Sequence, residues 1–162
     1  MKKIFLFILS SLLLLSCAGC GGGKGVQTYD PSSAVEALQE GGAFSEPLEE
    51  LSLSVAFPLY HLDMAGLTQE DVTDSAIRRS AGATCEECAV FVFADQDKAK
   101  AAQEALEGYL SDQIEANRDY RPGEVTKLEN ALLERLDTSV ALVVANDAQA
   151  ARTALDQSLS QN

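Results

Sequence analysis

The residues with the most reactive side chains lie close together, in the segment Cys85-Glu86-Glu87-Cys88. A C-x-x-C spacing serves thiol–disulfide exchange when a helix N-terminus lowers the pKa of a thiol. Here the motif precedes an apolar strand pattern, and its two carboxylates would raise the thiol pKa values. We therefore favour a local disulfide between Cys85 and Cys88 over unpaired thiols and over a redox or metal-binding pair. The bridge requires a turn at Glu86-Glu87, because residues three apart in a strand lie about 10 Å apart.

The rest of the chain supplies few groups for catalysis or metal binding. Its one histidine, His61, lies two residues before Asp63. Neither a G-x-S-x-G turn nor a glycine-rich phosphate loop is present. A zinc site needs about four ligands, and two cysteines with one distant histidine are a poor start. We therefore predict that the protein is not an enzyme and has no catalytic residue, bound metal or cofactor.

Three aromatic side chains are candidates for a binding surface. Tyr60 and Tyr120 are the main ones, with Phe44 as a third, because tyrosine is enriched at recognition sites. Packing in the core or at a corner of the fold is the alternative role for all three. The local basic pairs, Arg78-Arg79 and Arg118 with Arg121, are expected to balance an acidic surface.

The first 20 residues have the layout of a bacterial lipoprotein signal. Met1-Lys2-Lys3 is a short basic start, and residues 4–15 form an apolar run with one short serine interruption. The run is shorter than the roughly 20 apolar residues that span a bilayer. A small-residue junction with two cysteines, residues 16–20, follows it. We expect one of these cysteines to be lipidated and to become the mature N-terminus.

Cys17 is the favoured lipidation site and Cys20 the second choice. Leu14 and Ser16 precede Cys17 at the positions where lipoprotein signals carry an apolar and a small residue. Cys20 has the small pair Ala18-Gly19 before it, but Cys17 itself occupies the apolar position. An ordinary cleaved signal with a secreted product is the remaining alternative.

The signal sets the expected domain boundaries and location. Residues 1–16 are the signal peptide, residues 17–33 a lipidated N-terminus with a flexible glycine-rich tether, and residues 34–162 a single domain. A diacyl or triacyl anchor holds a protein firmly without a transmembrane helix. We therefore expect a lipid-anchored protein on the extracytoplasmic face of the cell membrane.

The composition limits the classes of partner. Removal of residues 1–16 leaves ten basic and 25 acidic residues, a net charge of −15. Nucleic acid is excluded as a partner by charge repulsion, and so is a domain lying flat on anionic lipid. Besides the membrane, the expected partner is an unknown envelope protein or a small ligand.

Hydrophobic periodicity predicts the elements of an α+β domain. Helices are expected over residues 32–40, from Asp95 or Asp97 to Arg118, over 124–130, and after Asn146 or Asp147. Strands are expected over residues 71–82, 89–94, 131–136 and 139–145. Residues 44–62 are expected to be irregular or briefly helical, since Pro58 interrupts a strand pattern.

These elements predict a two-layer domain with about four mostly antiparallel strands and helices packed on one face. The second half of the chain partly echoes the first. Residues 90–95 resemble residues 140–146, and each apolar strand is followed by an alanine-rich helix. A duplicated strand–strand–helix unit is one reading, and chance recurrence of alanine-rich helices is the other.

Several short segments in this order resemble the DUF4358 family of small bacterial lipoproteins, found mainly in Clostridia-like Firmicutes. They are Leu59-Tyr60-x-Leu62-Asp63, Glu70-Asp71-Val72, Glu87-x-Ala89-Val90-Phe91, Tyr120-x-Pro122 and the apolar strand at 140–145. The resemblance implies location and architecture, because the family has no assigned activity. Its members usually have an apolar residue at the position of Cys88 and no cysteine at that of Cys85, so the thiols are expected to be particular to this chain.

We conclude from the sequence that this is a membrane-anchored lipoprotein with a non-catalytic binding or interaction module in the cell envelope. The alternative is an envelope thiol–disulfide protein that uses Cys85 and Cys88. A passive structural lipoprotein is a third reading.

Overall fold

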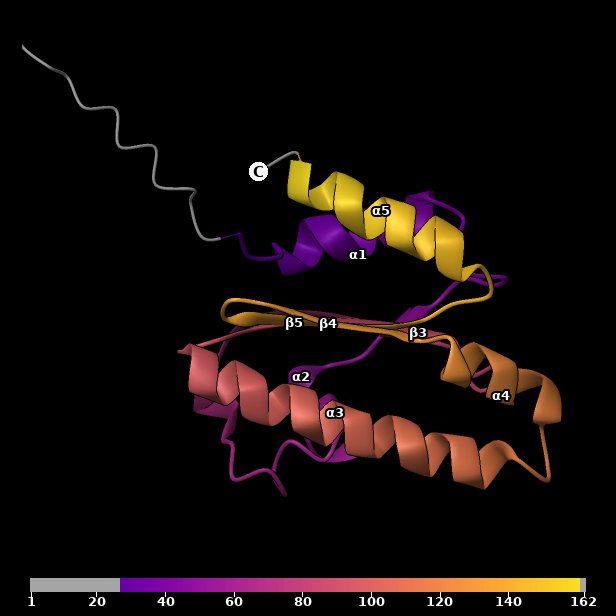
Figure 1. Cartoon of the computed structure of the whole chain (residues 1–162), viewed down its shortest axis with the longest axis horizontal. Coiled ribbons are helices and arrows are strands. Elements are labelled where there is room, and N and C mark those ends of the chain that lie inside the picture. The colour runs from indigo at the N-terminus through magenta and orange to yellow at the C-terminus, as the bar shows by residue number, and fades with distance from the viewer. Residues whose placement is uncertain (1–26, 161–162) are drawn as a thin grey trace, which may run out of the picture.

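A five-stranded antiparallel sheet forms the middle of the molecule (Figure 1). The computed structural model describes residues 27–160. The strands are β1 (Glu49–Glu50), β2 (Val72–Arg79), β3 (Glu87–Phe93), β4 (Leu132–Leu136) and β5 (Ser139–Val144). They lie in the order β1-β2-β3-β5-β4. The predicted α+β class is confirmed, and the strand not expected is the two-residue β1, which pairs with the end of β2.

Helices cover both faces of this sheet. They are α1 (Pro31–Glu40), α2 (Leu53–Leu59), α3 (Gln96–Asn117), α4 (Pro122–Glu129) and α5 (Ala148–Ser160), with the short 3-10 helix η1 (Gln69–Asp71). Figure 1 shows α1 and α5 on one face and α2, α3 and α4 on the other. The expectation of helices on one face is therefore wrong, and the domain has three layers. The reason is that β5 is buried along its whole length, so both of its faces need cover.

Two separate apolar cores follow from this arrangement. Phe91 and Leu142 point from the central strands toward α3, where Leu106 packs against them. Val90 and Val143 point to the opposite face and pack with α1 and α5. Because side chains alternate along a strand, each central strand contributes to both cores. The sheet is thus the shared wall of two apolar layers.

The order strand–strand–helix occurs twice, as β2-β3-α3 and β4-β5-α5. The two helices lie on opposite faces, since α3 packs in one core and α5 in the other. A two-fold axis normal to the sheet, which would relate two neighbouring antiparallel hairpins, keeps both helices on one face. The similarity between the two halves of the sequence therefore reflects a shared order of elements. The two strand–strand–helix units are not related by such a two-fold axis.

The fold begins earlier than the expected boundary at residue 34. Tyr29 is 2% exposed, its backbone N–H donates to Ser139 Oγ at 2.9 Å, and its hydroxyl donates to Glu134 Oε2 at 2.8 Å. Asp30 caps α1 by accepting a hydrogen bond from the backbone of Ser33. Residues 29–33, assigned above to the tether, are part of the domain.

The signal segment, with Cys17 and Cys20, lies outside the described residues. Within residues 27–160, no helix combines the length and the apolar character needed to cross a bilayer.

The replacement Tyr29→Ala should lower the free energy of unfolding by about 3 kcal/mol, because it empties a buried aromatic site and removes the hydrogen bond from the Tyr29 hydroxyl to Glu134. Chemical denaturation of the full chain measures this. Tyr120→Ala is the matched control, since Tyr120 is 88% exposed, and it should change stability by less than about 0.5 kcal/mol. Equal effects would contradict the placement of Tyr29 in the core.

Candidate functional site

Cys85 and Cys88 point to opposite faces of the sheet. Cys85 packs in the core beneath α3, and Cys88 packs in the core beneath α1 and α5. Both thiols are buried and free. Glu86-Glu87 forms no turn, because Glu87 already begins β3. The expected disulfide is therefore wrong for this structure: an extended backbone separates side chains three apart onto opposite faces.

Neither thiol is in a setting that activates it. Burial raises the pKa of Cys88 to about 12, and burial also raises the pKa of Cys85. A thiol with a raised pKa is a poor nucleophile at neutral pH. Nothing in the geometry supports the thiol–disulfide alternative.

The two glutamates between the thiols are buried carboxylates with shifted pKa values. The side chain of Glu87 is 1% exposed. It accepts hydrogen bonds from the hydroxyl of Tyr60 at 3.0 Å and of Tyr109 at 2.9 Å, and Arg79 Nε lies 3.3 Å away. Burial raises the pKa of Glu87, and Arg79 and the tyrosines offset part of that rise. Burial and the nearby Glu87 in turn raise the pKa of Tyr60 and Tyr109, so both hydroxyls stay protonated donors.

This network corrects the expected binding surface. Tyr60 is 0% exposed and its ring packs edge-on against Tyr109, with ring centroids 4.9 Å apart. Tyr120 lies in the turn after α3 with its side chain in solvent. The two predicted residues are not brought together, and only Tyr120 is at the surface. Tyr60 instead packs in the core, which was the alternative role considered from the sequence. It follows helix α2, whose buried face continues into the core.

Glu86 is the centre of a second buried network. It has no exposed surface, yet it accepts hydrogen bonds from the backbone N–H of Ser45 at 2.7 Å and from Lys127 Nζ at 2.8 Å. Burial alone would raise the pKa of Glu86, but Lys127 and Ser45 outweigh it and hold the pKa below its ordinary value. Lys127 also lies 3.2 Å from Glu124, whose other oxygen accepts from the backbone of Cys85. Helix α4 is thus tied to the start of β3.

These bonds also fix the segment of residues 44–51, which we call the strap. Ser45 is held by Glu86, as described. Glu46 accepts hydrogen bonds from the hydroxyls of Ser80 at 2.6 Å and Thr84 at 2.7 Å, and these bonds lower its pKa. The strap is therefore attached to the loop between β2 and β3 at two successive residues.

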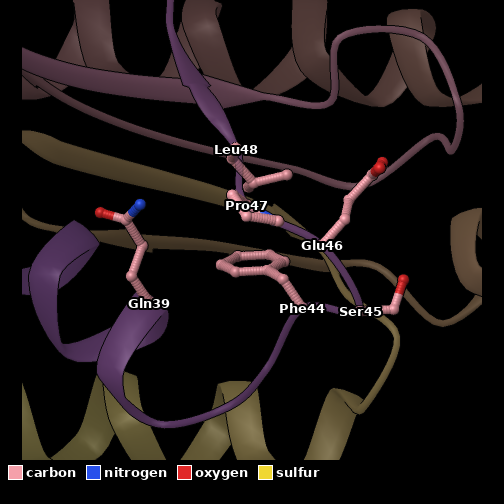
Figure 2. A pocket seen from close by; sticks show the side chains of 6 residues that line it. All are labelled: Gln39, Phe44, Ser45, Glu46, Pro47 and Leu48. Carbon is pink, nitrogen blue, oxygen red and sulfur yellow. The ribbon is translucent and has the colours of Figure 1, made fainter.

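Two hollows are lined by successive parts of the strap. The first, the Phe44 hollow, has a volume of about 430 Å³ and is lined by Gln39 and residues 44–48. Figure 2 shows the Phe44 ring beside Pro47, with Gln39 rising from α1 nearby and Glu46 extending away from the ring. The second, the arginine hollow, has a volume of about 330 Å³. Its lining is Glu49, Glu50, Leu51, Arg79, Ser80, Ala81, Gly82, Thr84 and Arg121.

Both hollows lie at the end of the sheet opposite to Tyr29. Tyr29 bonds to Ser139, the first residue of β5. Glu87 and Arg79 belong to the other end, since Glu87 pairs with Val144, the last residue of β5. Figure 1 shows this polarity, with α4 at one end and the beginning of α1 at the other.

His61 does not form a site with Asp63. Its Nδ1 lies 3.9 Å from Asp112 of α3, and its ring packs edge-on against Tyr109. Among residues 27–160, no three His, Cys, Asp or Glu side chains converge as a group that could hold a metal ion.

The sequence pointed to the thiols as the reactive groups of this segment, and the role of the two glutamates was not predicted. A signal was available, because Glu87 directly enters an apolar strand and Arg79 ends the preceding strand of the hairpin. Antiparallel pairing places these two residues opposite each other. The contacts of Tyr60 and Tyr109 with Glu87 could not be predicted in this way, because both tyrosines lie more than 20 residues from Glu87 in the chain.

Glu86→Gln and Glu87→Gln should change the pH dependence of stability in opposite directions. The lowered pKa of Glu86 means that its carboxylate stabilises the fold above pH 4.5 and that this contribution is lost as the pH falls through the lowered pKa. Glu86→Gln should therefore cost about 2 kcal/mol at neutral pH and less in acid. The raised pKa of Glu87 means that the wild type loses stability, relative to Glu87→Gln, as the pH rises through that pKa.

Urea denaturation between about pH 4 and pH 8 measures both differences. Glu129→Gln is the control, because Glu129 is an exposed carboxylate on the same helix as Lys127. Parallel pH profiles for the Glu86 and Glu87 variants would contradict the two networks.

Both thiols should be alkylated in denaturant without any reductant, because neither is in a disulfide. Iodoacetamide treatment of the full chain followed by peptide mass analysis would place two adducts on the peptide that contains Cys85 and Cys88. In the native state the same treatment should leave Cys88 unmodified, since it is buried and its pKa is about 12. A peptide that gains adducts only after reduction would show a bridge instead.

Comparison with known proteins agrees with the resemblance seen in the sequence. Residues 62–145 match the family described as Domain of unknown function (DUF4358), which is more than half of the chain. The matched span contains Glu86 and Glu87 with their partners Arg79, Tyr109 and Lys127. No curated protein and no solved structure matches the chain. The chain belongs to the DUF4358 family, whose domain has no assigned function.

Proposed function

We propose that this protein is a membrane-anchored, extracytoplasmic lipoprotein whose domain is a non-catalytic binding module for a component of the cell envelope. The observation that carries the proposal is the polarity of the domain. Tyr29, where the chain enters the fold, lies at one end of the sheet, and the strap with its two hollows lies at the other. A domain anchored before Tyr29 would turn its hollows away from the lipid.

The anchor is supported by the N-terminal sequence. A basic start, an apolar run of 12 residues and Cys17 follow the pattern of a lipoprotein signal, with Cys20 as the second candidate. A chain anchored at Cys17 has 11 residues between the lipid and Tyr29. The lipid would be the membrane contact, and the folded domain would be free to meet a partner.

A binding role is supported by the fixed shape of the strap. Ser45 and Glu46 are both hydrogen-bonded to neighbouring elements, so the walls of the hollows are formed before any partner arrives. A preformed site loses less conformational entropy on binding. The hollow volumes, about 330 and 430 Å³, lie in the lower part of the range for small-molecule sites.

The absence of catalysis is supported by the state of the perturbed groups. Catalytic acids and bases have shifted pKa values and also reach the substrate. Glu87, Tyr60 and Tyr109 have shifted pKa values, but their polar atoms bond to one another inside the core. Their hydrogen bonds are made to one another inside the core, which favours a structural role over catalysis.

Photo-crosslinking in membranes tests the proposal. The full chain is produced with a photoreactive phenylalanine analogue at position 44 or, as the control, at position 64, because Met64 is 81% exposed and lines neither the Phe44 hollow nor the arginine hollow. Position 44 should give one discrete adduct whose yield saturates, and position 64 should not. The mature N-terminal peptide from the same membranes should carry lipid on Cys17.

Three results would overturn parts of this proposal. An unmodified N-terminal peptide would remove the anchor. The same adducts at positions 44 and 64 would remove specific recognition at the strap. Turnover of a substrate by the purified chain would remove the non-catalytic assignment.

A further inference from the structure

We propose that the arginine hollow binds the oxyanion of a small ligand, a carboxylate or a phosphate group, between Arg79 and Arg121. This inference deepens the binding role proposed above and rests on it, but it does not depend on the lipid anchor.

The fold brings together two basic pairs that are distant in the sequence. Arg78-Arg79 ends β2, and Arg118 and Arg121 flank the turn between α3 and α4. In each pair one arginine meets a surface carboxylate: Arg78 lies 3.3 Å from Glu50, and Arg118 lies 3.1 Å from Glu115. The other members, Arg79 and Arg121, line the same hollow.

Arg121 is held in place without being neutralised. Its Nε donates to Asn117 Oδ1 at 2.9 Å, and its Nη1 lies 3.4 Å from the carbonyl oxygen of Gly82. Asn117 is buried and is itself held by the carbonyl of Gln113. Among the described residues Arg121 has no carboxylate within ion-pair distance, so its guanidinium keeps both its charge and unused donors.

Arg79, at the end of β2, supplies a second guanidinium to the lining of the hollow. Its Nε faces the buried Glu87, and its side chain is one-third exposed. A guanidinium carries five N–H donors in a planar fork, so the contact with Glu87 leaves donors for the hollow. Two guanidiniums facing one hollow are the arrangement that recognises carboxylate or phosphate oxygens in pairs.

The rim of the hollow narrows the class of ligand. Glu49 stands opposite Arg79 in the β1–β2 pairing, is exposed, and has no ion pair within the described part of the chain. Its negative charge disfavours a second negative charge on the ligand and favours an amino group there. A small monoanion with an amine, such as a short peptide, therefore fits better than a phosphate dianion. The volume of about 330 Å³ suits a ligand of that size.

Calorimetric titration of the mature chain, purified from the producing cells, tests this assignment. The probes are glycylglycine, which carries both charges, N-acetylglycylglycine, which carries only the carboxylate, glycylglycinamide, which carries only the amine, and inorganic phosphate. We expect glycylglycine to bind most tightly and glycylglycinamide not to bind. Arg121→Ala should weaken the binding of glycylglycine about tenfold or more, because it removes charged hydrogen bonds.

Arg118→Ala is the matched control. Arg118 lies three residues away and is exposed, but it does not line the hollow, so its removal should leave affinity unchanged. Phosphate binding that depends on Arg121 would support the oxyanion site and assign its ligand group to phosphate. Equal losses in the two variants, or no binding of any anion, would overturn the site. A saturable adduct at position 44 alongside that failure would leave the proposed function standing and remove only the ligand class.

Discussion

A carboxylate inside the core, Glu87, is the constraint on which the arrangement of three elements depends. A buried charge costs several kcal/mol in lost solvation unless donors surround it. The donors come from Tyr60 after α2, Tyr109 of α3 and Arg79 of β2. Arg79 lies on the neighbouring strand of the hairpin, and the two tyrosines come from helical segments more than 20 residues away. Apolar packing alone would allow α2 and α3 to slide along the sheet. The shared carboxylate defines one position in which all three donors reach it.

Glu86, the residue before β3, is a second buried carboxylate that fixes the elements around it. Its partners Ser45 and Lys127 hold the strap and α4 against the beginning of that strand. The Phe44 hollow and the arginine hollow are both lined by residues of the strap, so their shapes depend on this carboxylate. The two adjacent glutamates therefore connect the core to the part of the surface that could meet a ligand.

The sequence predicted the elements well and the contacts between them poorly. Helix α3 and strand β5 lie within a residue or two of their predicted bounds, because their apolar periodicity is strong and Asp95 caps the helix. Residues 89–94 are recognisable in the sequence as a strand. The prediction placed helices on one face of the sheet only, whereas this strand is buried on both faces and needs helices on each side. The short β1 carries almost no periodic signal, since it is two glutamates paired with Arg78 and Arg79. Phe44 was a candidate beside two tyrosines, and only the path of the strap places it at a hollow.

The four arginines near the arginine hollow differ in whether a carboxylate neutralises them. In a chain with a net charge of −13, acidic residues outnumber basic ones by 25 to 12. Arg78 and Arg118 take such partners, whereas Arg121 bonds to the side-chain oxygen of Asn117 and to a backbone carbonyl. A neutral amide orients a guanidinium without cancelling its charge. Neutralising the acidic surface does not require Arg121 to be held in this way. The arrangement leaves the positive charge of Arg121 beside Arg79, at the end of the sheet opposite to Tyr29. With the anchor before Tyr29 that we propose, this charge would face away from the lipid and toward the proposed anionic ligand.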